Sequence, residues 1–244
     1  KNINLDGVEQ IPDGKTFFWS GKYHHDMNSR DTLVTELNTL ADFNPKVPDH
    51  FKDAEVLLLG NLHPSVQMSV LDQMEKRPNL VILDTMNYWM EHTPNQLDAV
   101  LERIDVLAIN DEEARLLSGE YSLVKAAKKI LTKGPKYLVI KKGEHGALLF
   151  HDDQVFFAPA LPLEEVYDPT GAGDTFAGGL SAYLAESRHI SFDRLKSALI
   201  HGANLASFCV EKLGTDRMET LTRDEIASRL EVFRTLTQCV IELD

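Results

Sequence analysis

Residues 168–176 carry the side-chain and backbone types that phosphate chemistry needs. The segment reads DPTGAGDTF and leads into an apolar helix. Gly171 and Gly173 permit tight turns without a side chain in the way, so a row of backbone N–H groups should lie at the N-terminus of that helix. Exposed N–H groups and the helix dipole together form an anion site. The segment therefore predicts a phosphate-binding loop.

Asp174 lies inside this predicted loop and has two interpretations. A carboxylate at a helix N-terminus stabilises the helix by about 0.3–1 kcal/mol, so a capping role is the first. A carboxylate also repels phosphate, which makes it a poor choice for a loop that only grips an anion. The conflict disappears if Asp174 accepts the proton of a hydroxyl that attacks the phosphate, because a placed general base raises the rate by about 10²–10⁴. Residue chemistry alone leaves both roles open.

The composition of the chain argues against several classes of protein. A formal net charge of −13 over 244 residues does not suit a nucleic-acid partner, since phosphate backbones are bound by clustered Lys and Arg. No apolar run approaches the roughly 18 residues of a membrane span, and the first seven residues lack a signal-peptide core. Cys209 and Cys239 lie far apart, which favours free thiols in a reducing compartment. We therefore expect a cytoplasmic protein without a membrane or nucleic-acid partner.

The main body of the chain alternates between short apolar strands and helices. We predict strands at 56–59, 80–83, 106–109, 137–140, 147–150 and 155–157. Helices are expected at 64–77, between the second, third and fourth strands, and near 173–185, 192–211 and 222–235. This alternation predicts an α/β fold whose parallel sheet is covered on both faces. In such sheets ligands bind beyond the carboxyl ends of the strands. Upstream, the aromatic-rich residues 16–23 and residues 33–37 predict a small β element.

The phosphate-loop segment also resembles a family signature. DPTGAGDTFAGG, at residues 168–179, is similar to the C-terminal signature of the ribokinase-like carbohydrate kinases, also called the phosphofructokinase-B type. AINDEEARLLSG at 108–119, VIKKGEHGALLF at 139–150 and ANLASFCVEKLGT at 203–215 agree with it. The resemblance implies a three-layer sandwich with a small β lid. On this basis residues 1–43 are the remainder of the lid with its connection, and residues 44–244 the nucleotide-binding and catalytic domain.

The resemblance implies roles for the residues of the signature. Asp174 corresponds to the catalytic base, and the backbone amides of Gly171, Ala172 and Gly173 correspond to the anion hole. These amides would stabilise the charge that develops on the transferred phosphoryl group, and such stabilisation is often the main source of an enzyme's rate enhancement.

Further roles implied by the resemblance concern metal ions. Asp168 and Thr170 resemble ligands of a monovalent cation such as potassium, although an ordinary turn also explains Asp168. Asn110 and Glu113 form an Asn-x-x-Glu motif that in the family helps to organise magnesium and phosphate. The same two residues also fit a capping box, Asn at the N-cap and Glu three residues later. A Glu bonded to its cap is less free to act on water and metal, so both roles can hold only in part.

Three residues resemble parts of the family's nucleotide site. Lys141 and Gly143 lie where the chain wraps the nucleotide after a strand, and Asn204 lies in the region that flanks adenine. Each has a structural alternative. Adjacent lysines at 141 and 142 are often a solvated turn, and an Asn in the middle of a helix is equally consistent with a hydrogen-bonded core residue.

Together these features predict an ATP-dependent phosphotransferase that uses magnesium and acts on a hydroxyl of a sugar or nucleoside. The alternatives are a nucleotide-binding sensor or scaffold without catalysis, and a vitamin-type kinase of the same fold. The family's N-terminal strand, with its acceptor-gripping Asp and a following Gly-Gly motif, does not appear in the sequence, which starts without Met inside the lid pattern. We expect further N-terminal sequence, and the acceptor-binding residues stay unknown. A homodimer through the lid is an open option that residues 16–37 do not decide.

Overall fold

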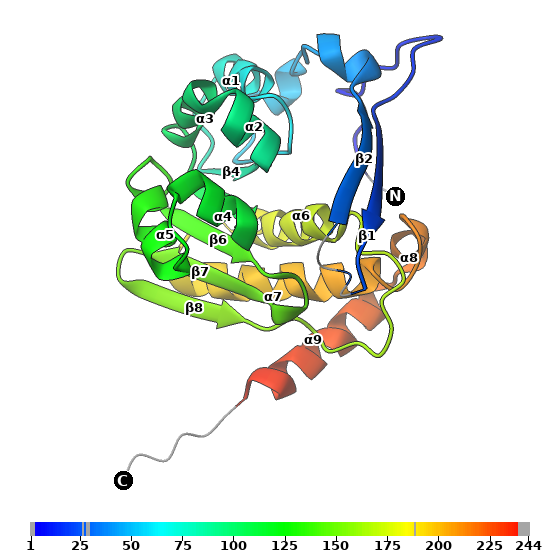
Figure 1. Ribbon diagram of the computed structural model, residues 1–244, viewed down its shortest axis with the longest axis vertical. Coiled ribbons are helices and arrows are strands. Elements are labelled where there is room, and N and C mark those ends of the chain that lie inside the picture. Colours follow the sequence, from blue (N-terminus) through cyan, green and yellow to red (C-terminus); the bar gives the residue numbers. More distant parts are fainter. Residues whose placement is uncertain (1–2, 26, 28–29, 188, 239–244) are drawn as a thin grey trace.

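The computed structural model of the chain describes residues 3–25, 27, 30–187 and 189–238. Six strands form the main sheet in the order β3-β4-β5-β6-β7-β8 (Figure 1). The strands are β3 (Val56–Leu59), β4 (Leu80–Asp84), β5 (Val106–Asn110), β6 (Tyr137–Lys141), β7 (Ala147–His151) and β8 (Gln154–Ala158). The first four are parallel, and β7 and β8 are antiparallel to their neighbours. The predicted, mostly parallel sheet is confirmed.

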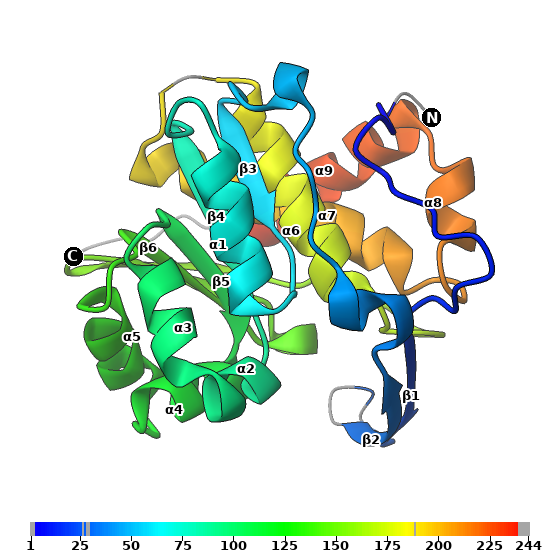
Figure 2. The same cartoon turned by 90° about the horizontal axis from the view of Figure 1, so that it is seen from above.

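Helices cover both faces of this sheet (Figure 2). One face packs against α1 (Pro64–Gln73), α2 (Asn87–His92), α3 (Pro94–Leu101), α4 (Asp111–Ser118) and α5 (Leu123–Leu131). The other face packs against α6 (Ala172–Ala185) and α7 (Phe192–Cys209). The helix α8 (Asp216–Thr220) follows α7, and α9 (Arg223–Thr237) packs on α7. The result is the three-layer arrangement that the sequence pattern predicts.

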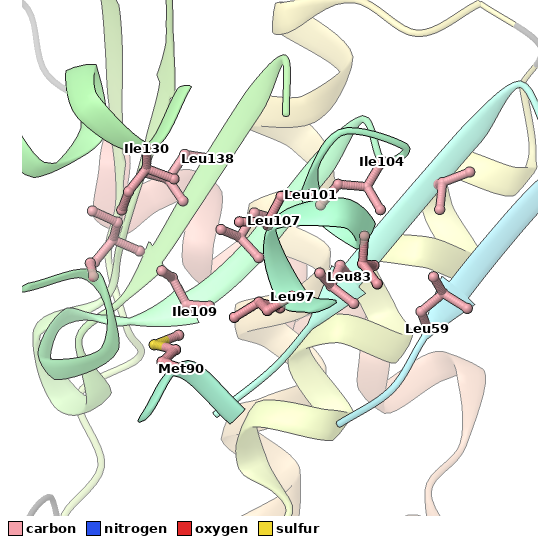
Figure 3. Packing of buried hydrophobic residues seen from close by; sticks show 14 of the residues in the cluster. Leu59, Leu83, Met90, Leu97, Leu101, Ile104, Leu107, Ile109, Ile130 and Leu138 are labelled. Carbon is pink, nitrogen blue, oxygen red and sulfur yellow. The ribbon is translucent and has the colours of Figure 1, made fainter. Parts of the chain in front are cut away.

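The core consists of two apolar layers, one on each side of the sheet. Side chains alternate along every strand, so Val81 and Leu83 of β4 enter one layer while Leu80 and Ile82 enter the other. Figure 3 shows the first layer, where Leu83 lies close to Leu97 and Leu101 of α3. Burying each such side chain stabilises the fold by about 1.5–3 kcal/mol. Burial on both faces explains why these strands are continuous apolar runs.

Two differences from the sequence prediction concern helices. The helix predicted at residues 64–77 ends at Gln73, because Met74 is extended and the N–H of Glu75 bonds instead to the carbonyl of Lys52 at 3.0 Å. The sequence pattern does not predict the helices α2 and α8. They contain 6 and 5 residues, too few for a period of 3.6 to be visible in the sequence.

The small β element is a two-stranded antiparallel sheet of β1 (Phe18–Tyr23) and β2 (Arg30–Glu36). It stands apart from the six-stranded sheet (Figure 1). The register shifts between Ser20 and Gly21, and Trp19 and Tyr23 of the same strand pack edge to face with ring centroids 6.5 Å apart. A Cβ at Gly21 would lie 2.3 Å from the Trp19 ring, so a side chain at this position would displace that ring. The small sheet lies within residues 1–43, the segment whose assignment as the remainder of a lid stays a prediction.

Candidate active site

Two predicted site residues, Asn110 and Lys141, lie at one edge of the main sheet together with Asp84. Asp84, Asn110 and Lys141 end the neighbouring strands β4, β5 and β6. Because parallel strands end at the same edge, their terminal side chains meet there. The helix α6, which carries Asp174 in its first turn, packs against β3 and α7. The fold therefore brings the strand ends and the signature loop to one place.

The loop before α6 is held by Asp168. One carboxylate oxygen accepts the N–H of Thr170 at 2.9 Å, and the other accepts the N–H of Gly214 at 3.3 Å. Burial tends to raise the pKa of Asp168, but the hydrogen bonds from Thr170 and Gly214 outweigh it and lower the pKa. Asp168 is thus an ionised turn residue. This role does not conflict with that of a cation ligand, since each oxygen has a second lone pair.

The predicted anion hole forms the start of α6. Gly171 is its N-cap with a φ of 80°, a conformation that favours glycine. The N–H of Ala172 bonds to the carbonyl of Pro169 at 3.1 Å. Within the described part of the chain, Gly171 and Gly173 are therefore the members of the predicted hole whose N–H groups keep no protein acceptor. Helix geometry leaves such first-turn donors available to an anion.

Asp174 projects from this turn without a hydrogen-bonded cap role. The N-cap of α6 has no side-chain hydrogen bond, and the Asp174 carboxylate has no hydrogen-bond partner among the described residues. The side chain opens to solvent, yet the protein around it partly removes it from water, which raises its pKa. The negative charge of Asp84 raises the pKa further, while Lys141 opposes both effects. A carboxylate with a raised pKa and no partner suits a proton acceptor.

The structure does not support the alternative that Lys141 belongs to a solvated turn together with Lys142. Its ammonium group lies 3.1 Å from a carboxylate oxygen of Asp84, and only 18% of its side chain is exposed. A Cβ at Gly173 would lie 3.3 Å from the same ammonium nitrogen. The positive charge therefore lies beside the first turn of α6, where a phosphate would meet both.

A cavity of about 410 Å³ opens beside this turn. Its lining includes the polar side chains of Lys141, Glu144 and Ser207 and the residues Gly143, Ala172 and Gly173. The rest is mostly apolar, with walls from Ala160, Leu161, Leu163, Val166, Phe176, Ala203, Ala206 and Val210. An apolar pocket of this size with a few convergent polar groups is typical of small-molecule sites. Two of the three predicted nucleotide residues line it.

Asn204 is the third predicted nucleotide residue, and it does not line this cavity. Its side chain is fully buried, and its amide donates a hydrogen bond to the carbonyl of Ile226 in α9 at 3.0 Å. The neighbouring Ala203 and Ser207 face the cavity instead. The geometry supports the alternative of a hydrogen-bonded core residue, which holds α7 against α9.

Asn110 and Glu113 form the capping box of α4. The Asn110 side chain accepts the N–H of Glu113 at 2.8 Å, and the Glu113 carboxylate accepts the N–H of Asn110 at 2.7 Å. Glu113 is only 8% exposed. The capping-box role is therefore confirmed, and one carboxylate oxygen of Glu113 is bonded to the backbone of Asn110.

The described residues contain no group of three or more His, Cys, Asp or Glu side chains that could cage a metal ion. The side-chain oxygens of Asn110 and Glu113 are nevertheless compatible with magnesium, because this ion keeps several waters and takes few protein ligands beside substrate phosphates. Cys209, one of the two cysteines, is a buried free thiol below the loop, with Sγ 3.8 Å from the Thr170 carbonyl. Cys239 lies outside the described residues.

Sequence reasoning misses two contributors to the site. Asp84 lies at a predicted strand end, and the rule for ligand sites in parallel sheets singles out its position, but nothing in the sequence pairs it with Lys141. Tyr23 is the second: its hydroxyl lies 3.0 Å from the hydroxyl of Thr170, so the small sheet contacts the signature loop. No local pattern could reveal a contact between residues that lie 147 positions apart.

The arrangement defines an α/β protein of the ribokinase-like fold. The chain superposes on the ribokinase of Arabidopsis thaliana complexed with ribose and ATP, with a TM-score of 0.74, 23% identity, and coverage of 94% of this chain and 73% of that one. It also superposes on a Burkholderia thailandensis nucleoside kinase in complex with inosine, with a TM-score of 0.70, 22% identity, and coverage of 94% and 74%.

The sequence comparisons give the family. The chain belongs to the pfkB family of carbohydrate kinases, whose model matches residues 1–221. It is 30% identical over 190 residues to the cytidine kinase of Thermococcus kodakarensis, covering 76% of this chain and 67% of that protein. It is 31% identical over 157 residues to a nucleoside kinase of Methanocaldococcus jannaschii, covering 64% and 49%. The chain thus spans about half to two thirds of the length of these relatives. Among the described residues no helix is long and apolar enough to cross a membrane.

Proposed function

We propose that the protein transfers the γ-phosphate of ATP to a hydroxyl of a sugar or nucleoside. One observation carries the proposal: a cavity of nucleotide size ends at the first turn of α6, where Lys141 and the N–H of Gly173 lie next to the carboxylate of Asp174. An anion site, a cation and a base in one place are what phosphoryl transfer to an alcohol requires.

In the proposed reaction Asp174 accepts the proton of the acceptor hydroxyl. The hydroxyl oxygen forms a bond to the γ-phosphorus, and the bond from that phosphorus to the bridging β–γ oxygen breaks. ADP leaves with the electron pair of the broken bond. The N–H groups at the start of α6 and the Lys141 ammonium group stabilise the negative charge on the transferred group. Catalysis here is mainly positioning and charge stabilisation.

Two ions belong to the proposal. Magnesium bound with ATP would neutralise phosphate charge, and Asn110 and Glu113 would act on it through water, since one Glu113 oxygen is already bonded to backbone. A monovalent cation would take oxygen ligands from Asp168 and Thr170. Both are tested by omitting the ion from the assay.

The acceptor class is also a proposal. The cytidine and nucleoside kinases among the relatives favour a nucleoside, and ribose in a superposed ribokinase favours a sugar as the second choice. A vitamin-type kinase and an inactive nucleotide-binding sensor have no observation in their favour here. Asp174, with its raised pKa, argues against the sensor. The cytoplasmic location and a homodimer through the lid stay predictions.

ADP release by the full-length protein tests the function. The assay would use ATP and magnesium with cytidine, inosine, ribose and fructose as separate acceptors. We expect turnover with at least one, and a larger kcat/KM for a nucleoside than for a free sugar. ATP binding by calorimetry without turnover on any acceptor would favour the sensor and contradict the proposal.

A further inference from the structure

The ion pair between Asp84 and Lys141 reaches across the sheet. The two residues end β4 and β6, which are separated by β5. Neighbouring strands lie about 4.8 Å apart, so the long Lys141 side chain must pass over the end of β5 to reach Asp84. Both side chains are largely enclosed, with 18% of Lys141 and 11% of Asp84 exposed. A long side chain fixed in this way has a defined position for its charge.

That position is beside the proposed phosphate site. The Lys141 ammonium nitrogen lies 3.3 Å from where a Cβ of Gly173 would be, so the absence of a side chain at Gly173 makes room for it. Only one of the three ammonium N–H donors is needed for the bond to Asp84. The remaining donors can meet a phosphate oxygen in the cavity that Lys141 lines.

Two carboxylates compete for this single ammonium group. The charge of Lys141 acts on the Asp174 carboxylate as well as on Asp84, but its hydrogen bond goes to Asp84. If Lys141 bonded to Asp174 instead, the ammonium group would stabilise the charged carboxylate and weaken it as a proton acceptor. Asp84 therefore separates the cation from the base while keeping both at the site.

We propose that Asp84 is a positioning residue, which holds the Lys141 ammonium group at the start of α6 and away from the carboxylate of Asp174. This rests on the proposed phosphotransfer. The charges that act on Asp174 among the described residues come from Asp84 on β4 and Lys141 on β6. On α7, which packs along α6, His201 responds to Glu186 and Arg194 rather than to Asp174.

The first experiment measures the titration of the Asp174 carboxyl group by ¹³C NMR without any substrate. Asp84→Asn removes a negative charge and frees Lys141, so the Asp174 titration should move to lower pH. Lys141→Met removes a positive charge, so it should move to higher pH. Asp105→Asn is the matched control: Asp105 is a buried carboxylate that pairs with Arg77 at 3.1 Å and precedes β5, at the opposite edge of the sheet.

The second experiment measures kcat and KM for ATP in the same variants. Asp84→Asn should lower kcat by about 10²-fold, the loss expected for misplaced catalytic groups, whereas Asp84→Glu should restore part of it. Asp105→Asn should lower the melting temperature and leave kcat unchanged. Equal losses of kcat in Asp84→Asn and Asp105→Asn, or identical Asp174 titrations in all variants, would overturn the proposal.

The two readouts separate this inference from the proposed function. If the full-length protein turns over no acceptor, the phosphotransfer proposal fails, but opposite shifts of the Asp174 titration would still establish the arrangement of charges. If the protein turns over an acceptor and the titration does not move, the function stands and the role of Asp84 is wrong. If Asp84→Asn does not fold, Asp84→Glu, which keeps the negative charge but moves the carboxylate that holds Lys141, supplies the same comparison of kcat with Asp105→Asn.

Discussion

The Tyr23 hydroxyl lies 3.0 Å from the Thr170 hydroxyl, which joins the end of β1 in the small sheet to the loop that precedes α6. The contact matters because the same loop supplies the proposed anion hole, which begins at the next residue. A hydrogen bond of this kind contributes about 0.5–1.5 kcal/mol. The contact therefore ties the small sheet to the signature loop, and we expect acceptor binding to depend on it because the family resemblance implies that this sheet is a lid.

The first prediction concerns this bond. Tyr23→Phe removes the hydroxyl and should raise KM for the acceptor about 2- to 10-fold, with kcat nearly unchanged. In a double-mutant cycle with Thr170→Val, the two changes should couple by about 0.5–1.5 kcal/mol. Tyr121→Phe, at a residue 86% exposed, is the control and should change nothing. Additive effects of Tyr23→Phe and Thr170→Val would show that the contact does not matter for binding.

The second prediction concerns Asp174 as base. Asp174→Asn keeps the shape of the side chain and removes proton acceptance, so kcat should fall by about 10²–10⁴ while ATP affinity, measured by calorimetry, survives. Asp193→Asn is the control, because Asp193 is likewise an acidic residue in the first turn of a helix, α7, where it pairs with Lys196. A collapse of ATP affinity in Asp174→Asn would make Asp174 structural.

The direction of the Asp174 pKa adds a stability readout to the same variant. Because the folded-state pKa is raised above its ordinary value of 3.8, the ionised carboxylate destabilises the folded protein, and stability falls as pH rises through that pKa. Asp174→Asn should therefore not lower the melting temperature at pH 7. It should lose turnover without losing stability, as expected at a site where function opposes stability.

The third prediction concerns acid unfolding and Glu225. Its hydrogen bonds to Thr222 and to Arg217 lower the pKa from 4.5 to about 2. The ionised form therefore stabilises the fold above pH 4.5, and the stabilisation is lost as the pH falls toward about 2. Glu225→Gln should lower the melting temperature at pH 7 and match the unaltered protein near that lower limit. Glu164→Gln, at an exposed site, should show no such difference, and a pH-independent loss in Glu225→Gln would contradict the mechanism.

Much of the fold could be predicted from sequence because buried strands and helices have regular patterns of apolar residues. Strands buried on both faces, such as β4 and β5, appear as apolar runs, and the rule for parallel sheets then locates ligands at their carboxyl ends. The glycines and aspartates of the signature loop are recognisable for a different reason, because their backbone conformation allows few other residue types. In both cases the cause lies within a few residues of the signal.

Contacts between distant residues could not be predicted in that way. Lys141 and Asp84 are 57 positions apart, and neither position shows in sequence that the other will face it. Asn204 is ambiguous in sequence because a buried Asn in a helix can bond a ligand or another helix, and only packing against α9 decides. The site thus divides into local parts that the sequence predicts and pairings that require the fold.

The final prediction uses two glycines with opposite surroundings. Gly146 has a φ of 80°, and a Cβ there would lie 2.1 Å from the carbonyl oxygen of Ala158, which is backbone and cannot move aside. Gly178 lies inside α6, and a Cβ there would meet nothing within 4 Å. Gly146→Ala combines strain with a backbone clash and should destabilise by more than about 1 kcal/mol.

Gly178→Ala should do the opposite, because alanine is favoured over glycine inside a helix by about 0.5–1 kcal/mol. Denaturant unfolding of both variants measures the difference. Gly146 also lines the proposed nucleotide cavity, so Gly146→Ala should weaken ATP binding under conditions where the variant is still folded. Equal stabilities would mean that the turn between β6 and β7 can rearrange around a side chain. In that case its tight approach to residues 158–160 would not be what shapes the cavity wall.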